Sequence, residues 1–537
     1  MVGEGCHNPS IVEWGEVDDR RIFMMTPCTD GSYYMYKSLV SLDYWSGSEP
    51  ISQVWGNSHD RKGEGARSGF ITVTIDGKKV MLLTTPVYSE EKGEGQLHLW
   101  VTDNVRVHDV GPVSREGDDA AASSLLYRAD KKELILLYEK KSGDSYSLVA
   151  VSLTEQLKQI KSMVKAWKDM DTALKNCVSI GTVDPRIKNV CKVPIPTKGL
   201  VGFWSNSLEG NLWKDEYLGV NATVHGGNVA GTEGGVRFRG AAAGAKWPVG
   251  NKGQFQPYYF VNKKFTLVAT VMINVVPEAE GPVPLMGVRM NDNASTVLVG
   301  LFYTKDKKWG VTVNGKSRGV PDKDGTWQPG TTYQVILKRH WNEFYVYIDN
   351  NELIWEKVPS FEYTPRGVLD FYVGGDSAKG THEVDVTVGN VLLYNEALDG
   401  DELTSLSVSK VTLPTPAGKG PFTTLGNDGE IASKLKPGEK RIGDGLNPKG
   451  PLPGETHKGS HGAGEESGSS PADGSKSTSA ILAKDTPSIS LSDDNSVDFD
   501  NLTRVRPDSG SGDGTMRGCV SRLFLLLLGL WGFAALC

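Results

Sequence analysis

Residues 152–175 read SLTEQLKQIKSMVKAWKDMDTALK and separate two regions whose sequence pattern is that of β-strands. The apolar side chains in this segment recur at spacings of three, four and seven residues, at Leu153, Leu157, Ile160, Val164, Trp167 and Leu174. This period places them on one face of a long amphipathic helix, which we expect to pack against a neighbouring domain. Ser152 and Glu155 have the spacing of a capping box at the start of the helix.

The region before the helix, residues 1–151, consists of short strand-like runs separated by tight turns. Ile71–Ile75 and Val80–Leu83 flank Asp76 and Gly77, and this dipeptide is a strong signal for a β-hairpin. Clusters of strands recur about every 40–50 residues, which is the spacing of four-stranded propeller blades. The sequence therefore predicts about three blades of a β-propeller in this region.

Strand patterns return over residues 197–410, as in Phe265–Val276 and Val384–Tyr394, but without the blade spacing. A long run of strands without helices is typical of a two-sheet jelly roll. Residues 411–514 are rich in Gly, Pro, Ser, Lys and Asp and poor in aromatic residues. Such a segment cannot bury enough surface to offset chain entropy, so we expect a disordered stalk.

The chain ends in the uncharged run LFLLLLGLWGFAALC, residues 523–537, after the small residues of positions 509–514. A membrane-spanning helix needs about 20 apolar residues, so this run is short for a span. Small residues, a polar spacer and a terminal apolar run form the signal for a glycosylphosphatidylinositol (GPI) anchor. We expect residues 515–537 to be this signal and Asp513 to be the attachment residue, on a protein at the cell surface. A short tail-anchoring helix is the alternative.

The start of the chain raises a different expectation. Residues 1–21 contain no apolar run of the length found in a signal peptide. A GPI signal acts only in the secretory pathway, so we expect that the true N-terminus is missing and that the chain is a fragment.

The six cysteines fall into three sequence pairs, which are Cys6 with Cys28, Cys177 with Cys191, and Cys519 with Cys537. Cys177 and Cys191 bracket a short loop, and we expect them to form a structural disulfide. The pairing of Cys6 and Cys28 stays open. None of these spacings is that of a zinc site, so we expect no metal and no cofactor.

Glycosylation and charge indicate what kind of partner to expect. Three sequons have the form of N-glycosylation sites and begin at Asn221, Asn293 and Asn501, as in a secreted glycoprotein. The net charge of −7 is mild, and Lys and Arg form no cluster. We therefore expect no nucleic-acid partner.

One strand-like segment resembles the signature VTVxNVxLYN of the trypanosome trans-sialidase superfamily. The matching residues are Val386, Thr387, Val388, Asn390, Val391, Leu393, Tyr394 and Asn395. The family's next residue is Arg, whereas this chain has Glu396. Cys6–Trp14 and Leu97–Asn104 also resemble family motifs, so the resemblance covers nearly the whole chain except the stalk.

The resemblance implies a mainly all-β fold with a six-bladed sialidase propeller, a connecting helix and a lectin-like jelly roll of the concanavalin or laminin-G type. Residues 1–151 would be the C-terminal part of the propeller. Residues 152–178 would be the helix, and residues 197–410 would be the jelly roll. About three blades cannot close a propeller, and this strengthens the expectation of a fragment.

The resemblance also assigns the positions of sialidase chemistry. This chemistry needs arginines that bind a carboxylate, a tyrosine nucleophile activated by a glutamate, and an aspartic acid. Asn8 stands where the family has the glutamate base, Pro27 where it has an arginine, and Ala122 where it has the nucleophile. The loop containing Glu94 lacks a further family Arg and Trp, and only Glu139 matches a family residue that supports an arginine.

These replacements predict a protein without catalytic activity that is displayed at the cell surface. The resemblance implies adhesion to host cell-surface or matrix glycoproteins and glycans, or immune evasion. Four tryptophans are candidate platforms for stacking a sugar or are simply core residues: Trp204, Trp213, Trp247 and Trp327. The alternatives are an active exo-α-sialidase or trans-sialidase, and a degenerate gene fragment whose product does not fold or reach the surface.

Overall fold

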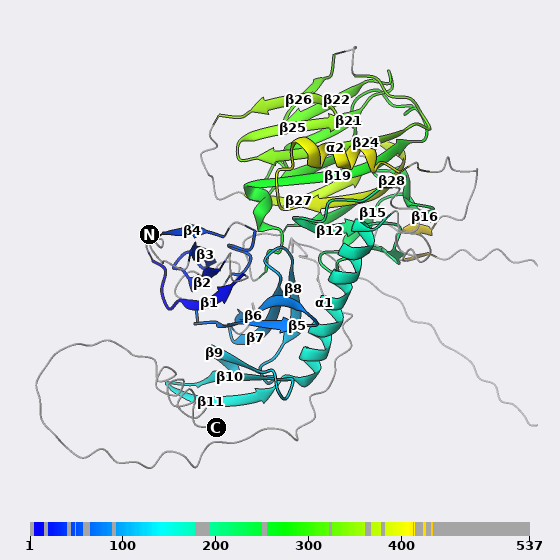
Figure 1. Ribbon diagram of the computed structural model, residues 1–537. Helices are drawn as coiled ribbons and strands as arrows, with labels where there is room; N and C mark the ends of the chain where they lie inside the picture. The colour runs from blue at the N-terminus through cyan, green and yellow to red at the C-terminus, as the bar shows by residue number, and fades with distance from the viewer. Residues whose placement is uncertain are drawn as a thin grey trace, which may run out of the picture. The chain divides into compact units, whose positions relative to one another are not determined.

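The computed structural model describes the parts of the chain that carry the strands and helices (Figure 1). The described residues are 5–15, 20–39, 44–48, 50–56, 65–88, 93–177, 193–249, 255–321, 325–359, 367–376, 382–411, 413, 423–425 and 431–432. They form a mainly β structure with one long helix, as expected. No described helix is long and apolar enough to cross a membrane.

The N-terminal region forms three antiparallel sheets in which each strand pairs with the next along the chain. The first sheet contains β1 (Ser10–Trp14), β2 (Arg21–Pro27), β3 (Tyr33–Leu39) and β4 (Trp45–Gly47). The second contains β5 (Gly69–Ile75), β6 (Lys78–Tyr88), β7 (Gly95–Thr102) and β8 (Val107–Pro112). The third contains β9 (Asp119–Arg128), β10 (Glu133–Ser142) and β11 (Ser145–Ser152). These sheets are the predicted propeller blades.

The predicted hairpin at Asp76-Gly77 is confirmed. Ile75 pairs with Lys78, so the loop has two residues. Asp76 and Gly77 both adopt positive φ, at 48° and 77°, as the turn that matches the twist of two antiparallel strands requires.

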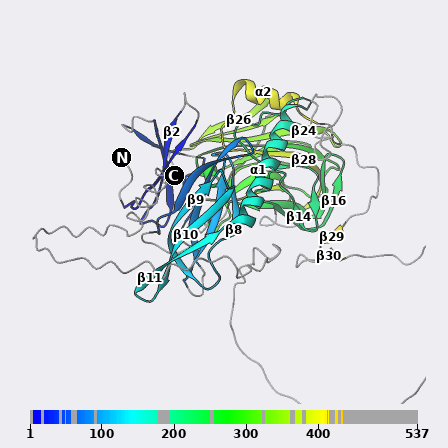
Figure 2. The ribbon, with the colours of Figure 1, turned by 60° about the horizontal axis from the view of Figure 1, so that its bottom comes forward.

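Helix α1 (Thr154–Lys175) has the predicted apolar face, which is buried along its length. Figures 1 and 2 both show α1 beside β8 and β10, and contacts join it to both strands. The predicted capping box is wrong. Leu153 is the N-cap residue and no side chain caps the helix, because Ser152 lies against Thr154 and Glu155 pairs with Lys158.

The C-terminal region forms two large antiparallel sheets packed face to face around one core. The nine-stranded sheet contains β13 (Leu208–Glu209), β14 (Leu212–Trp213), β15 (Ala222–His225), β18 (Gly244–Pro248), β20 (Val283–Met290), β21 (Val297–Tyr303), β22 (Trp309–Val313), β23 (Lys316–Gly319) and β27 (Val368–Gly374). The ten-stranded sheet contains β12 (Leu200–Trp204), β16 (Asn228–Thr232), β17 (Gly235–Ala241), β19 (Lys264–Ile273), β24 (Thr332–His340), β25 (Glu343–Ile348), β26 (Asn351–Lys357), β28 (Glu383–Tyr394), β29 (Thr423–Leu425) and β30 (Ile431–Ala432). This is the expected lectin-like sandwich.

The sandwich differs from the sequence-based expectation in two ways. We expected strands without helices, but the 3₁₀ helix η2 (Tyr259–Asn262) and helix α2 (Gly400–Val408) are also present. We expected no order after residue 411, but β29 pairs with β16 and β30 pairs with β29. Isolated segments of two or three residues carry no period that would distinguish them from a loop in the sequence.

Candidate functional site

Residues 67–69, at the start of β5, connect the three N-terminal sheets through hydrogen bonds to β1 and β9. The Ser10 hydroxyl donates to the Ser68 carbonyl at 2.7 Å. The Gly69 amide donates to Ser123 Oγ at 3.1 Å, and the Ser123 amide donates to the Arg67 carbonyl at 3.1 Å. These bonds tie β1 to β9, so the positions that precede Ser10 and Ser123 belong to adjoining strands.

Asn8 and Pro27 lie on neighbouring segments at the start of β1 and the end of β2. The amide of His7 donates to the Pro27 carbonyl at 2.9 Å, and the Thr26 hydroxyl donates to the His7 carbonyl at 2.7 Å. The disulfide Cys6–Cys28 crosslinks the same two segments, which answers the pairing that the sequence left open. Asn8 itself is exposed and has a positive φ of 50°.

Ala122 and Glu139 meet at a β-bulge between β9 and β10. Tyr138 pairs with Ser123 and Lys140 with Ala120, so two alanines face the single residue Glu139. Burial raises the pKa of the Glu139 carboxyl. Bulges of this kind re-aim side chains and are frequent beside active sites.

The remaining position of the site, Glu94, is exposed and lies just before β7. Its neighbour Gly95 donates its amide to Asp119 Oδ1 at 2.9 Å, and this brings the position close to the start of β9. Of the five positions, Asn8 and Glu94 thus lie just before β1 and β7, Pro27 ends β2, and Ala122 and Glu139 lie within β9 and β10. Their side chains are the amide of Asn8, the ring of Pro27, the methyl group of Ala122 and the carboxylates of Glu94 and Glu139.

A tyrosine does lie beside Glu139, but its surroundings differ from those of a nucleophile. Tyr138 is fully buried, and its hydroxyl donates to Asp118 Oδ2 at 2.5 Å. Burial and this hydrogen bond to a carboxylate both raise the pKa of the phenol. A nucleophilic tyrosine needs a lowered pKa or an adjacent base that faces the substrate, so Tyr138 is a structural residue.

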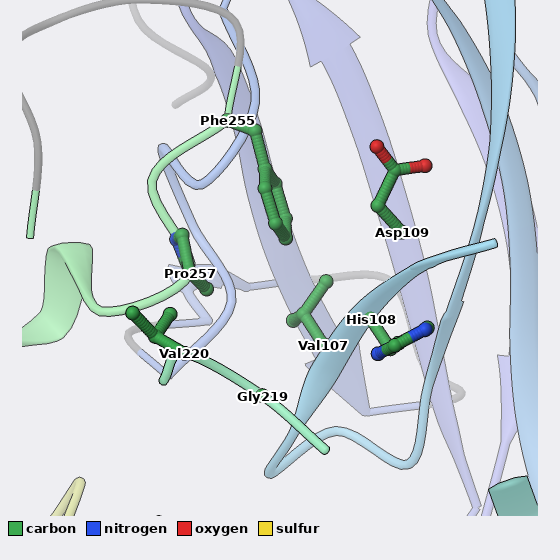
Figure 3. Close-up of a pocket in the computed structure, with 7 residues that line it drawn as sticks. All are labelled: Val107, His108, Asp109, Gly219, Val220, Phe255 and Pro257. Carbon is green, nitrogen blue, oxygen red and sulfur yellow. The ribbon is translucent and has the colours of Figure 1, made fainter. Parts of the chain in front are cut away.

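A crevice that the sequence did not indicate opens between β8 and two loops of the lectin-like region (Figure 3). Its volume is about 460 Å³ including the open mouth, and its lining residues are Val107, His108, Asp109, Gly219, Val220, Phe255 and Pro257. His108 Nδ1 donates to the Leu218 carbonyl at 2.8 Å, and burial lowers the pKa of this imidazole. Asp109 accepts from His98 Nδ1 at 2.9 Å. Both polar groups are thus occupied by structural bonds.

Next to the crevice, one buried arginine joins the N-terminal sheets, helix α1 and the lectin-like region. Arg106 Nη1 donates to Asp103 Oδ2 at 3.0 Å, and Nη2 donates to Asp171 Oδ1 at 2.7 Å. The guanidinium lies 4.1 Å from the ring centre of Tyr217, whose hydroxyl also donates to Asp171 Oδ1 at 2.7 Å. Trp167 completes the junction by donating its indole N–H to the Tyr217 carbonyl at 2.8 Å.

The residues of the predicted signature lie on β28, except for Asn395, which directly follows it. β28 is an interior strand of the ten-stranded sheet and pairs with β12, β17 and β19. The side chains of the signature residues are buried. At its end, the Tyr394 hydroxyl donates to the Pro196 carbonyl at 2.8 Å, and Asn395 donates to the Val105 carbonyl at 3.3 Å. The signature strand is therefore part of the sandwich core. The residue that follows it contacts the loop before β8.

The four tryptophans named as candidate stacking platforms are core residues. Trp204, Trp213, Trp247 and Trp327 are each 0% exposed. Trp247, for example, packs against Trp204 and Phe371 with ring-centre distances of 4.7 Å and 5.6 Å. A ring without exposed surface cannot stack on a ligand, so this candidate role is wrong.

The remaining predicted positions fall partly outside the described residues. Asn293 is exposed, whereas the Asn221 side chain accepts a hydrogen bond from the Asp215 amide at 3.0 Å. Cys177 is disulfide-bonded, but its predicted partner Cys191 lies outside the described residues, as do Asn501 and Asp513. Among the described residues, no cluster of His, Cys, Asp and Glu could hold a metal ion.

The chain matches three protein-family models. They are a BNR repeat-like domain over residues 1–139, the C-terminal domain of trans-sialidase over residues 196–401, and the hydrophobic C-terminal segment of Trypanosoma trans-sialidase over residues 513–536.

Two relatives and one solved structure illustrate the similarity. A sialidase of Trypanosoma cruzi is 32% identical over 420 residues, which are 77% of this chain and 35% of the relative. Sialidase 85-1.3 of T. cruzi is 32% identical over 179 residues, which are 33% of this chain and 99% of that relative. The structure of T. rangeli sialidase in complex with 2,3-difluorosialic acid superposes with a TM-score of 0.66 and 34% identity, over 75% of this chain and 62% of the other.

This chain therefore spans about a third of the length of the first relative and less than two thirds of the solved sialidase. The matches nevertheless cover both β regions and the C-terminal segment. The chain belongs to the trypanosome trans-sialidase superfamily.

Proposed function

We propose that this chain is a catalytically inactive, GPI-anchored surface glycoprotein that takes part in adhesion to host cells or matrix, or in immune evasion. The observation that carries the proposal is the set of residues at three positions of the propeller. Asn8, Pro27 and Ala122 replace the base, one arginine and the nucleophile that the family resemblance assigns there.

The chemistry of these side chains supports the loss of activity. A neutral amide cannot remove a proton from a tyrosine, and a methyl group cannot attack an anomeric carbon. A proline ring has no donors with which to hold the carboxylate of a sialic acid, a role that suits the planar fork of arginine. The β-bulge at Ala122 could orient a side chain for catalysis, but the methyl group of alanine has no reactive atom.

The first prediction concerns turnover. We expect the full-length protein to release or transfer sialic acid from a fluorogenic donor at the rate of a blank reaction. Loss of nucleophile and base typically costs about 10⁴-fold or more in rate. The assay would run beside T. rangeli sialidase at equal concentration, with circular dichroism to confirm that the chain is folded. Turnover above the blank contradicts the proposal.

A matched control tests the three replacements in a relative. In the T. rangeli enzyme, the residues aligned with positions 8, 27 and 122 would be replaced by Asn, Pro and Ala. We expect this folded enzyme to lose turnover to the same degree. If it stays active, the three residues are not the cause of inactivity.

The second prediction concerns the anchor, which the hydrophobic C-terminal match supports. Phosphatidylinositol-specific phospholipase C should release the epitope-tagged protein from the surface of intact cells. Bulky residues in place of the small residues 511–514 should abolish surface display, because the anchor is attached only at small side chains. A protein that stays on cells after phospholipase treatment, as a tail-anchored helix would, refutes the GPI anchor.

A further inference from the structure

β24, β25 and β26 form one edge of the ten-stranded sheet (Figure 1). A row of aromatic side chains lies on the outer face of this edge, in which Tyr345 and Tyr347 are half-buried and Trp355 is exposed. Tyr345 pairs with Lys338 on one side and with Trp355 on the other, so the three side chains share one face. Tyr347 is on the same face because it is two residues further along β25. The alternate residues Leu337, Phe344, Val346 and Ile354 are buried in the core of the sandwich.

Helix α2 covers only part of this outer face. Gln334, which has the same orientation as Lys338, donates to the Leu406 carbonyl of α2 at 2.7 Å. Ile336 is buried in the cluster that contains Leu403 and Leu406. Tyr347 packs against the same cluster and is half-buried, as is Tyr345, whereas Trp355 is 53% exposed. Large apolar side chains that gather on a solvent-facing surface are typical of binding sites.

The two tyrosine rings are parallel. Tyr345 and Tyr347 have centres 6.3 Å apart and planes inclined by only 7°. Trp355 is the cross-strand neighbour of Tyr345 and extends the surface to the edge of the sheet. Aromatic rings suit the C–H face of a pyranose ring, which packs on them, and rings held in place by their neighbours lose little side-chain entropy on binding.

Polar groups surround the rings and are already oriented. Tyr345 donates its hydroxyl to Glu343 Oε2 at 3.0 Å, and Tyr347 donates to Glu352 Oε2 at 3.2 Å. Glu343 also accepts from Lys357 at 3.0 Å. Carboxylates have several lone pairs, so each retains acceptor capacity for the hydroxyl groups of a ligand.

Beneath the rings is a lysine with little solvent contact. Lys338 is 7% exposed, and its Nζ lies 4.2 Å from the ring centre of Tyr345 and 5.6 Å from that of Tyr347. Its charge is also acted on by the carboxylates of Asp399, Glu352 and Glu343. An ammonium group has three donors, so it can bind a ligand oxygen while it keeps these contacts. Burial lowers the pKa of this ammonium group.

The balance of charge indicates what the surface would bind. Asp399, Glu343 and Glu352 supply three carboxylates, whereas Lys338 and Lys357 supply two ammonium groups, so the surface has no excess of positive charge. Nothing in this balance favours a phosphate, sulfate or carboxylate group. Hydroxyl groups, which both donate and accept, match a mixture of carboxylates, phenols and ammonium.

We propose that Tyr345, Tyr347 and Trp355, together with Glu343, Glu352 and Lys338, form a binding site for neutral glycans. The C–H faces of the sugars pack on the rings, and their hydroxyl groups bond to the carboxylates and to Lys338. This site deepens the proposed adhesion function and rests on it, because it names the ligand class and the surface that contacts the host.

The test uses the full-length protein, solubilised in detergent, on an array of neutral, sialylated and sulfated glycans. We expect saturable binding to neutral glycans, and Trp355→Ala should weaken it about tenfold or more, as truncation of a central aromatic contact does. Trp355→Phe should retain most of the binding, whereas Lys338→Met should weaken it. Tyr146→Ala is the matched control, because Tyr146 is 58% exposed on β11 of the propeller region.

The outcomes distinguish this site from the broader function. Absence of binding to neutral glycans, preference for sialylated or sulfated ones, or equal binding by Trp355→Ala and Tyr146→Ala would each overturn the site. Adhesion to host cells is measured in parallel with the same variants. If Trp355→Ala still adheres to host cells, the adhesion function is retained but this site does not mediate it. Adhesion that needs Trp355 but survives removal of cell-surface glycans identifies a protein partner instead, and also overturns the site.

Discussion

Replacing Arg106 with alanine should lower the free energy of unfolding by about 3–5 kcal/mol, the cost of breaking a buried ion pair by removing one partner. The Arg106 and Asp103 side chains are each only 5% exposed. Without the guanidinium, Asp103 keeps one ion pair, with Lys78 at 2.6 Å, besides its backbone amide donors, and Asp171 loses its 2.7 Å ion pair. The ring of Tyr217 also loses the cation that lies on its face. Denaturant unfolding followed by tryptophan fluorescence measures the change.

The pH dependence of this variant has a definite sign. Burial raises the pKa of Asp103, but the neighbouring Arg106 and Lys78 outweigh it, and the net pKa is lowered in the folded protein. A carboxyl with a lowered folded pKa stabilises the protein above its unfolded pKa, near 4, and this stabilisation is lost as the pH falls further. The difference in stability between the wild type and Arg106→Ala should therefore shrink below about pH 4.

The control for Arg106 is a second ion pair at the surface. Arg20 and Glu13 lie 3.2 Å apart, but their side chains are 48% and 53% exposed. An exposed pair of this kind contributes about 0–1 kcal/mol, so Arg20→Ala should unfold almost like the wild type. If Arg106→Ala unfolds at the same denaturant concentration as Arg20→Ala, the buried network is not a major source of stability.

Trp247→Ala should cost about 3–5 kcal/mol, as large-to-small substitutions of core aromatic residues do. Trp247 is fully buried on β18, and its ring packs between Trp204 and Phe371. Phe371 continues the contact to Phe265 on the other sheet, at a ring-centre distance of 5.6 Å, so the cavity would open between the two layers of the sandwich. Thermal unfolding and denaturant midpoints measure the loss.

Trp355→Ala is the matched control, because the same side chain is removed from an exposed position. We expect a change of less than about 1 kcal/mol. A similar loss of stability in both variants would mean that Trp355 has a structural role in the sandwich, and its effect on glycan binding would then need the Trp355→Phe variant for interpretation.

Periodic features could be predicted from the sequence, because they depend on neighbours a few residues apart. The apolar face of α1 and the hairpin at Asp76-Gly77 are of this kind. The capping box failed because Ser152 and Glu155 found other local partners. Spacing alone does not decide between competing hydrogen bonds of similar strength.

Contacts between distant residues could not be predicted from a single sequence. Arg106, Asp171 and Tyr217 are brought together from three different parts of the chain, and no local pattern marks them. The tryptophans illustrate the same limit. Trp247 and Trp355 both lie on strands, and no local sequence pattern distinguishes them. Trp247 is nevertheless buried and Trp355 is exposed. Which face of a strand is buried depends on the elements that pack against it. A strand that is buried on both faces does not show the alternation of apolar and polar residues.

The interior position of β28 has a consequence for which parts of this protein an antibody could bind. The strand that marks the family is hydrogen-bonded on both sides, and its side chains are buried. Antibodies bind exposed surface, so on the folded protein this shared segment is no epitope. The surface they reach is that of the edges and loops, which tolerate sequence change far more readily than an interior strand. A family built on this sandwich can thus vary what immune receptors contact while its framework stays the same.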